Sequence, residues 1–482
     1  MQSPRKRMVR SMSRDVVIVS AAERPCWRFN KVGQVSMAAN TFPSSLGSQA
    51  GELPKPKPVT PGPRAWIALG MLIVVYVLNF LSRQLPGILA KPIQDSLHVS
   101  DGQLGRIGGL YFALFYCCIS IPVGWLADRT NRSRVLAIAC AIWSAATMWC
   151  GGAASYLQFA IAYMTVGFGE AGGVPPSYSI ISDYFPPGRR GRALGLYNVG
   201  PPIGAALGIA FGASIAATFS WRYAFVLLGS AGLVAVIGVL ILVPEPRRGG
   251  LDRAPDHAAP IKRGFAETLA MFVSRPALLL AALASGANQF VTYGLTNFAV
   301  LFLMREKGMT LKQIAVYYAL VVAIGMGGGI LASGPVIDRF TRRSKQAYAL
   351  VPATSLSLAL PFYLIFVWTP SWRLALFFLT GTMFLNYFYL TSVVTLVQEE
   401  VRPDQRVMSG ALLLLIMNLI GLGLGPTFVG ATSDFFHASH PHQSLQIALY
   451  LLASLYFVAV SLFLLLARVL TTESRIVGGT IP

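Results

Sequence analysis

The sequence predicts an all-α membrane protein, with twelve transmembrane helices in two six-helix pseudo-symmetric halves. Of its 482 residues, 54% are hydrophobic and only 12% are charged, about half the charged fraction of an average soluble domain. Twelve apolar runs are each long enough to cross a bilayer. A short polar segment of the first half also returns in the second half, which indicates an internal repeat.

The repeated segment lies between the second and third apolar runs and returns after the eighth. It reads GWLADRTNRSR from Gly124 and GPVIDRFTRR from Gly334. The separation between Asp128 and Asp338 is close to half of the hydrophobic part of the chain. We expect a short loop at each place that turns the chain back at the membrane surface, with Gly124 permitting close approach of two helix backbones.

The segment resembles the signature loop G-x-L-A-D-R-x-x-R of the major facilitator superfamily of secondary transporters. The resemblance covers residues 66–470 and implies the major facilitator fold, working by alternating access as the two halves rock. It also implies that both loops act as gates, with Asp128 holding the start of the eleventh span. The gating residues are Gly124, Asp128, Arg129 and Arg132 in the first loop, and Gly334, Asp338 and Arg339 in the second.

Hydropathy and charge divide the chain into five parts. Residues 1–64 form a basic, disordered N-terminal tail; 65–243 the N-terminal half; 244–276 a cytoplasmic linker; 277–468 the C-terminal half; and 469–482 a C-terminal tail. The basic tail could bind anionic lipids; the alternative is a solvated tail that helps to keep the N-terminus inside. The expected spans are 65–90, 104–126, 135–152, 157–181, 193–218 and 223–243, then 277–304, 313–337, 348–368, 373–397, 407–431 and 445–466.

The distribution of charge predicts the topology. The formal net charge is +20, and most of the 39 Lys and Arg residues lie in the N-terminal tail, the even-numbered loops and the linker. Positive loops stay on the cytoplasmic side, so we expect an integral protein of the plasma (inner) membrane with both termini cytoplasmic. The charge lies in loops rather than on a soluble face, so we expect membrane lipids as partners and no nucleic acid. We expect a monomer, the usual state in the superfamily.

Two charged residues lie inside predicted spans, Arg83 in the first and Glu170 in the fourth. A charge in hydrocarbon is unfavourable by several kcal/mol unless it is paired or hydrated, so it indicates function. Counting from the span ends places both at similar depth, where they could pair. We assign them to the substrate cavity; the alternative is a purely structural ion pair.

The residues around both charges resemble motifs of the spinster branch of the superfamily, which exports lysophospholipids and sphingoid lipids. These motifs are NFLSRQ from Asn79 and GFGEA from Gly167. Ser82 stands where the branch usually has an Asp implicated in proton coupling, and Tyr163 stands where the superfamily usually has an Arg. Glu170 is then the carboxylate of the expected cavity that could carry a coupling proton.

Two further groups of residues have expected roles. Gly-Pro segments in the fifth and eleventh spans, matching bends of the superfamily, are expected hinges because proline removes a helical hydrogen bond. The hinge residues are Gly200, Pro201, Gly204, Gly425 and Pro426. Polar residues of the second half should face the bundle interior, as substrate contacts or helix–helix hydrogen bonds. The cavity candidates among them are Asn288, Tyr293, Asn297 and Asn386.

The expected function is secondary active transport of an amphipathic or organic anion, lysolipid-like by resemblance, with a coupling proton and no cofactor or metal. The sequence has no G-x-x-x-x-G-K-[ST] phosphate loop for an ATP-driven pump. An enzyme is not expected, because all five histidines lie outside the spans. The alternatives are a small organic acid or drug transporter of another branch, and a transport-inactive receptor or scaffold.

The topology can be tested by cysteine accessibility. Single cysteines placed in the linker, 244–276, should react with a membrane-impermeant maleimide only after the cytoplasmic face is exposed, because the linker carries the positive charge that stays inside. Labelling of intact cells from outside would contradict this topology.

Overall fold

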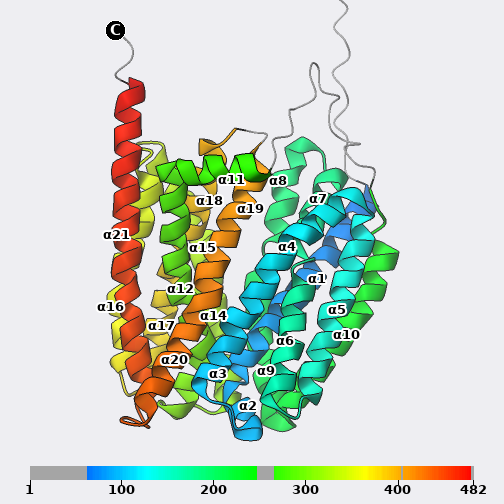
Figure 1. Ribbon diagram of the computed structural model, residues 1–482, viewed down its shortest axis with the longest axis vertical. Coiled ribbons are helices and arrows are strands. Elements are labelled where there is room, and N and C mark those ends of the chain that lie inside the picture. Colours follow the sequence, from blue (N-terminus) through cyan, green and yellow to red (C-terminus); the bar gives the residue numbers. More distant parts are fainter. Residues whose placement is uncertain (1–61, 247–264, 403–404, 479–482) are drawn as a thin grey trace, which may run out of the picture. The chain divides into compact units, whose positions relative to one another are not determined.

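The structure is a computed structural model that describes residues 62–246, 265–402 and 405–478, and these residues fold almost entirely into helices (Figure 1). Residues 1–61 of the predicted tail at 1–64, residues 247–264 of the predicted linker, and residues 403–404 and 479–482 lie outside the described residues. We use the names N-terminal bundle for the helices of residues 63–242 and C-terminal bundle for those of 265–478.

The N-terminal bundle begins at Pro63, and several of its helices start at residues suited to that position. Ser100, Asn131, Ser155 and Ser220 each accept a hydrogen bond from a backbone N–H of the following turn, which satisfies a donor that the helix leaves free. The elements are α1 (Pro63–Ile88), α2 (Ala90–Leu97), α3 (Asp101–Arg106), η1 (Ile107–Tyr111), α4 (Phe112–Arg129), α5 (Arg132–Gly152), α6 (Tyr156–Glu170), α7 (Val174–Tyr184), α8 (Pro187–Tyr197), α9 (Gly200–Thr218) and α10 (Trp221–Leu242).

The C-terminal bundle repeats this pattern, and three of its segments are wound more widely than an α-helix. These π-type turns are η2 (Ile314–Tyr318), η3 (Ala323–Gly327) and η5 (Leu419–Leu424). The remaining elements are α11 (Phe265–Ser274), α12 (Pro276–Arg305), α13 (Leu311–Gln313), α14 (Ala319–Val322), α15 (Gly328–Thr341), α16 (Ala347–Trp368), α17 (Trp372–Asn386), α18 (Phe388–Glu400), α19 (Arg406–Asn418), α20 (Gly425–His437) and α21 (Ser444–Gly478).

The predicted membrane fold is confirmed. Within the described residues, eleven helices are long and apolar enough to cross a membrane. The fourth predicted span, 157–181, is divided instead of continuous: α6 has 15 residues and α7 has 11, each too short to cross alone. The chain turns at 171–173, and Pro175 and Pro176 at the start of α7 have no N–H to continue the helix. Together, α6 and α7 supply the remaining crossing.

The two repeated segments are shorter loops than predicted. Helix α4 runs on to Arg129 and α5 begins at Arg132, so only Thr130 and Asn131 are non-helical. In the second half, α15 continues to Thr341. The predicted gating residues therefore lie within helices and not in loops. The side chain of Asn131 caps α5 by accepting from the Arg134 N–H at 2.9 Å, which fixes the sharp return.

Hydrogen bonds between the two bundles gather at one end of the molecule, where α3 of the N-terminal bundle lies beside α20 (Figure 1) and η1 contacts η5. We call the region formed by residues 97–111, 297–310 and 425–446 the joined end. Gly105 makes the backbone contact possible: a Cβ added there would lie 2.4 Å from the Pro426 carbonyl oxygen. The two helices thus touch along their backbones at this end.

A buried carboxylate forms the centre of the joined end. Asp101 is 4% exposed and pairs with Arg305 of α12, with an Nη2–Oδ2 distance of 2.8 Å. Its remaining acceptor sites are also used, because Gln94 donates at 2.6 Å and Ser433 at 2.6 Å. Since Asp101 and Gln94 belong to one bundle and Arg305 and Ser433 to the other, this network holds the bundles together.

Asp434 provides a second connection across the joined end. Its Oδ2 accepts from the Ser100 hydroxyl at 2.7 Å and from the Gly102 N–H at 3.0 Å. A carboxylate of the C-terminal bundle therefore binds the first turn of α3 in the N-terminal bundle. Such charge-assisted hydrogen bonds to free N–H groups are among the stronger polar contacts in proteins.

At the opposite end, which carries the two repeated segments, the predicted close approach is absent. A Cβ added at Gly124 would meet only the Pro175 side chain, at 3.9 Å, and one added at Gly334 would meet no atom within 4 Å. The expectation that Gly124 permits a close helix contact is therefore wrong for this conformation. The two ends therefore differ: the backbone contact at Gly105 is tight, whereas Gly124 and Gly334 have open space beside them.

The joined end can be tested by removing its carboxylates. We expect Asp101→Asn combined with Asp434→Asn to increase the distance between the bundles at this end, because breaking a buried ion pair costs about 3–5 kcal/mol. Spin labels near residues 103 and 437 would measure the distance by pulsed electron resonance. Asp95→Asn is the matched control, because Asp95 pairs with Lys91 inside one bundle. An unchanged distance distribution in the double variant would contradict the proposed role.

Glu306, which follows α12 directly, predicts a pH dependence of stability. Burial raises the pKa of its carboxyl to about 7, although Arg305, the Gln446 N–H and Lys307 lower it. The folded protein then binds a proton more tightly than the unfolded chain, so stability falls as pH rises from about 4.5 to 7. The unfolding temperature of the native protein should fall as the pH rises from 4.5 to 8, and Glu306→Gln should remove part of this fall. Identical pH profiles of the two proteins would rule this out.

Candidate functional site

The predicted charges Arg83 and Glu170 lie together inside the N-terminal bundle. Arg83 stands on α1, and its side chain is 9% exposed; Glu170 is the last residue of α6, and its side chain is 0% exposed. Two nitrogens of the guanidinium bind one carboxylate oxygen: Nη2 lies 2.7 Å and Nε lies 3.0 Å from Glu170 Oε2. The expectation that the two residues pair across the first and fourth spans therefore agrees with the geometry.

The helices make this pair possible through their irregularities. Glu170 closes α6 because the chain turns at 171–173 before Pro175 and Pro176. A carboxylate at a helix C-terminus meets the negative end of the dipole, so Glu170 depends on a cation such as Arg83. In α1, Pro86 lacks the N–H that would bond to the Ser82 carbonyl. Both partners thus lie beside an interruption of regular hydrogen bonding.

Three aromatic rings surround the guanidinium. The Cζ of Arg83 lies 4.8 Å from the centroid of Phe80, 5.0 Å from that of Phe112 and 5.0 Å from that of Tyr116. Rings at this distance attract a cation through their faces. They also exclude water, which strengthens the attraction between Arg83 and its anion. None of the three rings was among the predicted site residues. The signal in the sequence is helical spacing: Phe80 lies one turn from Arg83 on α1, and Phe112 and Tyr116 lie one turn apart on α4.

The positions that depart from the family pattern still contact the pair. The Ser82 hydroxyl lies 2.9 Å from Glu170 Oε1 and 2.7 Å from the Asn79 carbonyl oxygen, and its single hydrogen can serve one of them at a time. Tyr163 donates its hydroxyl to the Arg83 carbonyl at 3.2 Å. Asn79 is buried, and its Nδ2 has no hydrogen-bond partner. Such an orphaned donor is unfavourable and suits a site that binds a polar group.

On the C-terminal bundle, Asn288 and Asn386 are brought together. Asn288 Nδ2 donates to the Asn386 carbonyl at 3.0 Å, and the Tyr456 hydroxyl donates to Asn386 Oδ1 at 3.0 Å. These hydrogen bonds connect α12, α17 and α21. In this conformation the two residues therefore form helix–helix hydrogen bonds, the second of the two roles expected from the sequence. Asn288 Oδ1 and Asn386 Nδ2 remain buried without partners. Tyr456 was not predicted, because one tyrosine in an apolar span carries no sequence signal.

Tyr293 and Asn297 lie farther along α12, toward the joined end. Asn297 Nδ2 donates to the Tyr293 carbonyl at 3.1 Å. The amide oxygen of Asn297 lies 2.5 Å from the position of a Cβ added at Gly108, so Asn297 packs against the N-terminal bundle. Asn297 thus lies apart from Asn288 and Asn386, although the sequence analysis placed all three among the cavity candidates.

The predicted gating residues have different surroundings. Asp128 and Arg129 end α4, and the Arg129 guanidinium lies 4.0 Å from the Trp125 ring centroid. Asp338 and Arg339 are exposed on α15. Arg132 is instead buried inside the N-terminal bundle, where it pairs with Asp183 at 2.6 Å and Glu245 at 2.8 Å. In this conformation Arg132 therefore ties α5 to the end of α7 and to the segment after α10.

The expected hinge residues lie at interruptions of their spans. The fifth span is divided between α8 and α9, and Gly200 and Pro201 begin α9. A Cβ added at Gly204 would lie 2.5 Å from the Val77 carbonyl oxygen, so α9 packs closely on α1. In the eleventh span, Gly425 and Pro426 begin α20 directly after the π-type segment η5.

The polar network of the joined end was missed by the sequence analysis. Asp101 stands in a Ser100–Gln103 capping box, a recognisable helix start, but this turn precedes the predicted span at 104–126. Asp434 and Ser433 follow the predicted end of the eleventh span, and Arg305 follows the seventh. Their contacts depend on which helix ends meet, and no local pattern encodes that. The described residues also contain no cluster of His, Cys, Asp and Glu that could hold a metal ion.

Comparison with known proteins shows the family of this chain. The model of the Major Facilitator Superfamily matches residues 72–426. The chain belongs to this superfamily. It is 31% identical over 395 residues to an MFS-type efflux pump of Mycolicibacterium smegmatis, covering 82% of this chain and 90% of the relative. It is 24% identical to protein spinster homolog 1 of Xenopus tropicalis, covering 76% of this chain and 72% of the relative.

A solved structure extends the comparison to three dimensions. The crystal structure of a bacterial homolog to the human lysosomal transporter spinster, in an inward-facing and unoccupied conformation, superposes with a TM-score of 0.79 and 29% identity. The match covers 85% of this chain and 98% of that chain. The chain is therefore an integral membrane transporter of the superfamily with spinster-like relatives, and not an enzyme.

Proposed function

We propose that this transporter carries an amphipathic or organic anion, lysolipid-like in form, whose anionic head binds Arg83. The observation that carries this proposal is the buried guanidinium paired with Glu170. A cation at that place needs an anion at every stage of transport, because leaving it unpaired would be strongly unfavourable. Glu170 and the substrate head can satisfy it in turn.

Exchange between the two anions also offers a route for coupling to a proton. When Glu170 binds a proton, its charge is lost and its attraction to Arg83 weakens. The guanidinium can then bind the substrate head through its planar set of N–H groups, which match carboxylate and phosphate oxygens. Ser82 cannot titrate in place of the Asp usual in spinster relatives. Glu170 is therefore our candidate for the whole proton linkage.

The surroundings of Arg83 favour a substrate with an apolar part. Phe80, Phe112 and Tyr116 offer ring faces beside the charge. Across the bundle interface, the unpartnered amide groups of Asn288 and Asn386 could bind polar groups of a larger head. A substrate site with a charge and aromatic rings in one bundle and amide groups in the other would fit an amphipathic molecule better than a simple sugar.

The conformation supports an alternating-access cycle. The bundles contact each other at the joined end, and the gate glycines at the opposite end are open. With both termini in the cytoplasm, as we propose from the charge distribution, this conformation opens inward. The solved relative with a TM-score of 0.79 is also described as inward-facing. In the other state, we expect Asp128 to hold the start of α19.

One observation favours a second candidate function. The relative that is 31% identical is described as an MFS-type efflux pump. Export of amphipathic drugs would use the same aromatic surroundings of Arg83. This function would mean that transport runs outward. The two candidates differ in the head group: a lysolipid or organic anion requires Arg83, whereas an uncharged drug requires only the rings.

Transport in proteoliposomes with the two single variants tests the proposal. Glu170→Gln should remove the pH dependence of transport, because the remaining titratable partner of Arg83 is gone. Arg83→Ala should abolish binding of anionic substrates such as lysophosphatidylglycerol. The readouts are tracer uptake between pH 5.5 and 8 and binding measured in detergent. Unchanged pH dependence in Glu170→Gln would show that the pair is structural.

Folding must be controlled in this experiment. Arg83→Ala leaves Glu170 buried without a partner, a change that costs about 3–5 kcal/mol. The double variant Arg83→Met with Glu170→Gln removes both charges at similar volume, so it should unfold near the temperature of the native protein. A double variant that folds but does not transport anions supports the proposal. One that folds and transports normally assigns the pair a purely structural role.

A further inference from the structure

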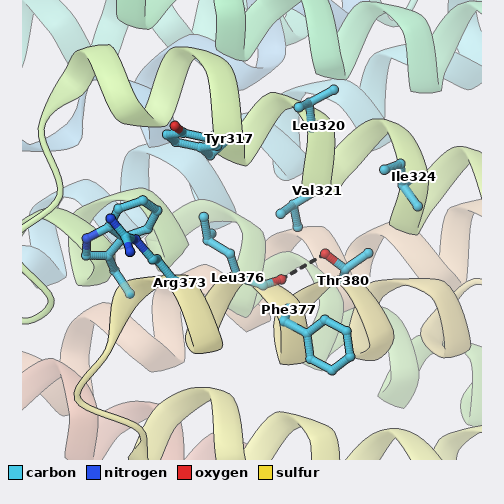
Figure 2. A pocket seen from close by; sticks show the side chains of 9 residues that line it. Tyr317, Leu320, Val321, Ile324, Arg373, Leu376, Phe377 and Thr380 are labelled. Atoms are coloured by element: carbon cyan, nitrogen blue, oxygen red, sulfur yellow. Dashed lines mark hydrogen bonds between the residues drawn. The ribbon is translucent and has the colours of Figure 1, made fainter.

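An apolar groove lies between the eighth and tenth spans of the C-terminal bundle, away from Arg83 and Glu170. Its volume is about 380 Å³. Figure 2 shows the lining side chains of the two spans, with Tyr317, Leu320 and Ile324 on one span and Arg373 and Phe377 on the other. These residues belong to η2, α14, η3 and α17.

The residues at the two ends of the groove differ in size, which indicates that the groove widens toward the start of both spans. At its deep end the two spans pack tightly: a Cβ added at Gly325 would lie 2.7 Å from the Met383 Cβ, and one added at Gly329 would lie 2.4 Å from the Phe384 carbonyl oxygen. Toward the start of both spans the glycines give way to Tyr317 and Trp372, which hold the helices apart. The π-type turns η2 and η3 lie along this stretch, and such turns are frequent at functional sites.

The walls of the groove face the membrane. Leu320 is 53% exposed, Ile324 is 58% exposed and Phe377 is 67% exposed. All three belong to helices that are long and apolar enough to span the membrane, so we place these exposed side chains against the hydrocarbon of the bilayer. The polar group of the floor is satisfied, because the Thr380 hydroxyl donates to the Leu376 carbonyl at 2.8 Å (Figure 2). The groove therefore suits an acyl chain.

The wide end of the groove has the character of a membrane–water interface. The rings of Tyr317 and Trp372 lie 5.4 Å apart, and such residues prefer the level of the lipid head groups. This end lies on the same side of the molecule as the joined end, because Val367, near the end of α16, accepts hydrogen bonds from Lys307 and Gln446. A lipid could thus place its head beside Trp372 and its chain along Leu320.

Arg373 supplies a positive charge at this level. Its guanidinium lies 5.3 Å from the Trp372 ring centroid. Among the residues that the structure describes, no carboxylate pairs with Arg373, whereas Lys91 pairs with Asp95 and Arg305 with Asp101. A guanidinium held on a ring keeps its fork of N–H groups available for a phosphate. The positive charge of Arg373 and the apolar groove together suit a ligand that is an anionic amphiphile.

We propose that this groove binds an anionic phospholipid of the bilayer, with its phosphate on Arg373 and one acyl chain along Leu320, Ile324 and Phe377. The lipid is a bound partner of the fold and not the transported substrate. The site does not involve Arg83 or Glu170, and it stands whether or not the substrate assigned to that pair is right.

Native mass spectrometry of the full-length protein, titrated with phosphatidylglycerol, tests whether the charge of Arg373 contributes to lipid binding. Arg373→Gln should weaken binding about tenfold, because it removes charge-assisted hydrogen bonds to the phosphate. Lys312→Gln is the matched control: Lys312 is exposed at the start of the same span but does not line the groove. An equal loss in both variants would show general attraction of lipid to positive charge and would overturn the site.

A second pair of measurements tests the groove itself. Leu320→Trp fills the groove while Arg373 is kept, so it should weaken binding of phosphatidylglycerol but leave thermal unfolding unchanged, since Leu320 faces outward. Glycerol phosphate, which has the head group and no chain, should not compete. Competition by glycerol phosphate would assign a free-phosphate site instead. If Leu320→Trp does not fold, the comparison of Arg373→Gln with Lys312→Gln still decides between the outcomes.

Discussion

The contact between Arg83 and Glu170 constrains much of the N-terminal bundle. Both side chains are removed from water inside helices that span a membrane, where neither charge is tolerated alone. Each must therefore be held at hydrogen-bond distance from the other, as the 2.7 Å separation of Arg83 Nη2 and Glu170 Oε2 shows. That requirement links α1 to the end of α6 through side chains, and Phe80, Phe112 and Tyr116 surround the guanidinium.

Interrupted helices accompany the polar positions of the fold. The fourth span breaks directly after Glu170, the fifth breaks before Gly200, and the eleventh widens before Gly425. A continuous α-helix binds all of its internal backbone groups to itself, so a site that needs free polar groups within the membrane requires such interruptions. We expect parts of a helix to tilt at the same places, as an alternating-access cycle requires. On this proposal, binding and movement have the same structural origin.

The two ends of the molecule differ in how the bundles meet. At the joined end, Asp101 pairs with Arg305 and Asp434 binds the first turn of α3. At the opposite end, Gly124 and Gly334 have open space beside them. A protein that alternates between two states must exchange one set of contacts for another of similar free energy. The joined end supplies one such set, built from hydrogen bonds and an ion pair between the bundles.

The sequence by itself determined the membrane class, the two related halves and the identity of the two central charges. Apolar runs, the repeat around Asp128 and Asp338, and the rarity of charge in spans are local properties, and they survive in any arrangement of the helices. The sequence also indicated the interruptions at Gly200 and Gly425, because proline and glycine act on their own helix. It did not show that the fourth span divides after Glu170, although Pro175 and Pro176 were visible.

Only the tertiary structure decided which helix ends meet. Asp101, Arg305 and Asp434 lie outside the predicted spans, where charges are ordinary, and they become significant because packing brings them together across the bundles. Arg132 resembled a gate residue, yet the fold buries it against Asp183 and Glu245. The ring surroundings of Arg83 and the link from Tyr456 to Asn386 likewise come from distant segments. Such contacts depend on the position of whole helices, which hydrophobic periodicity in one segment does not encode.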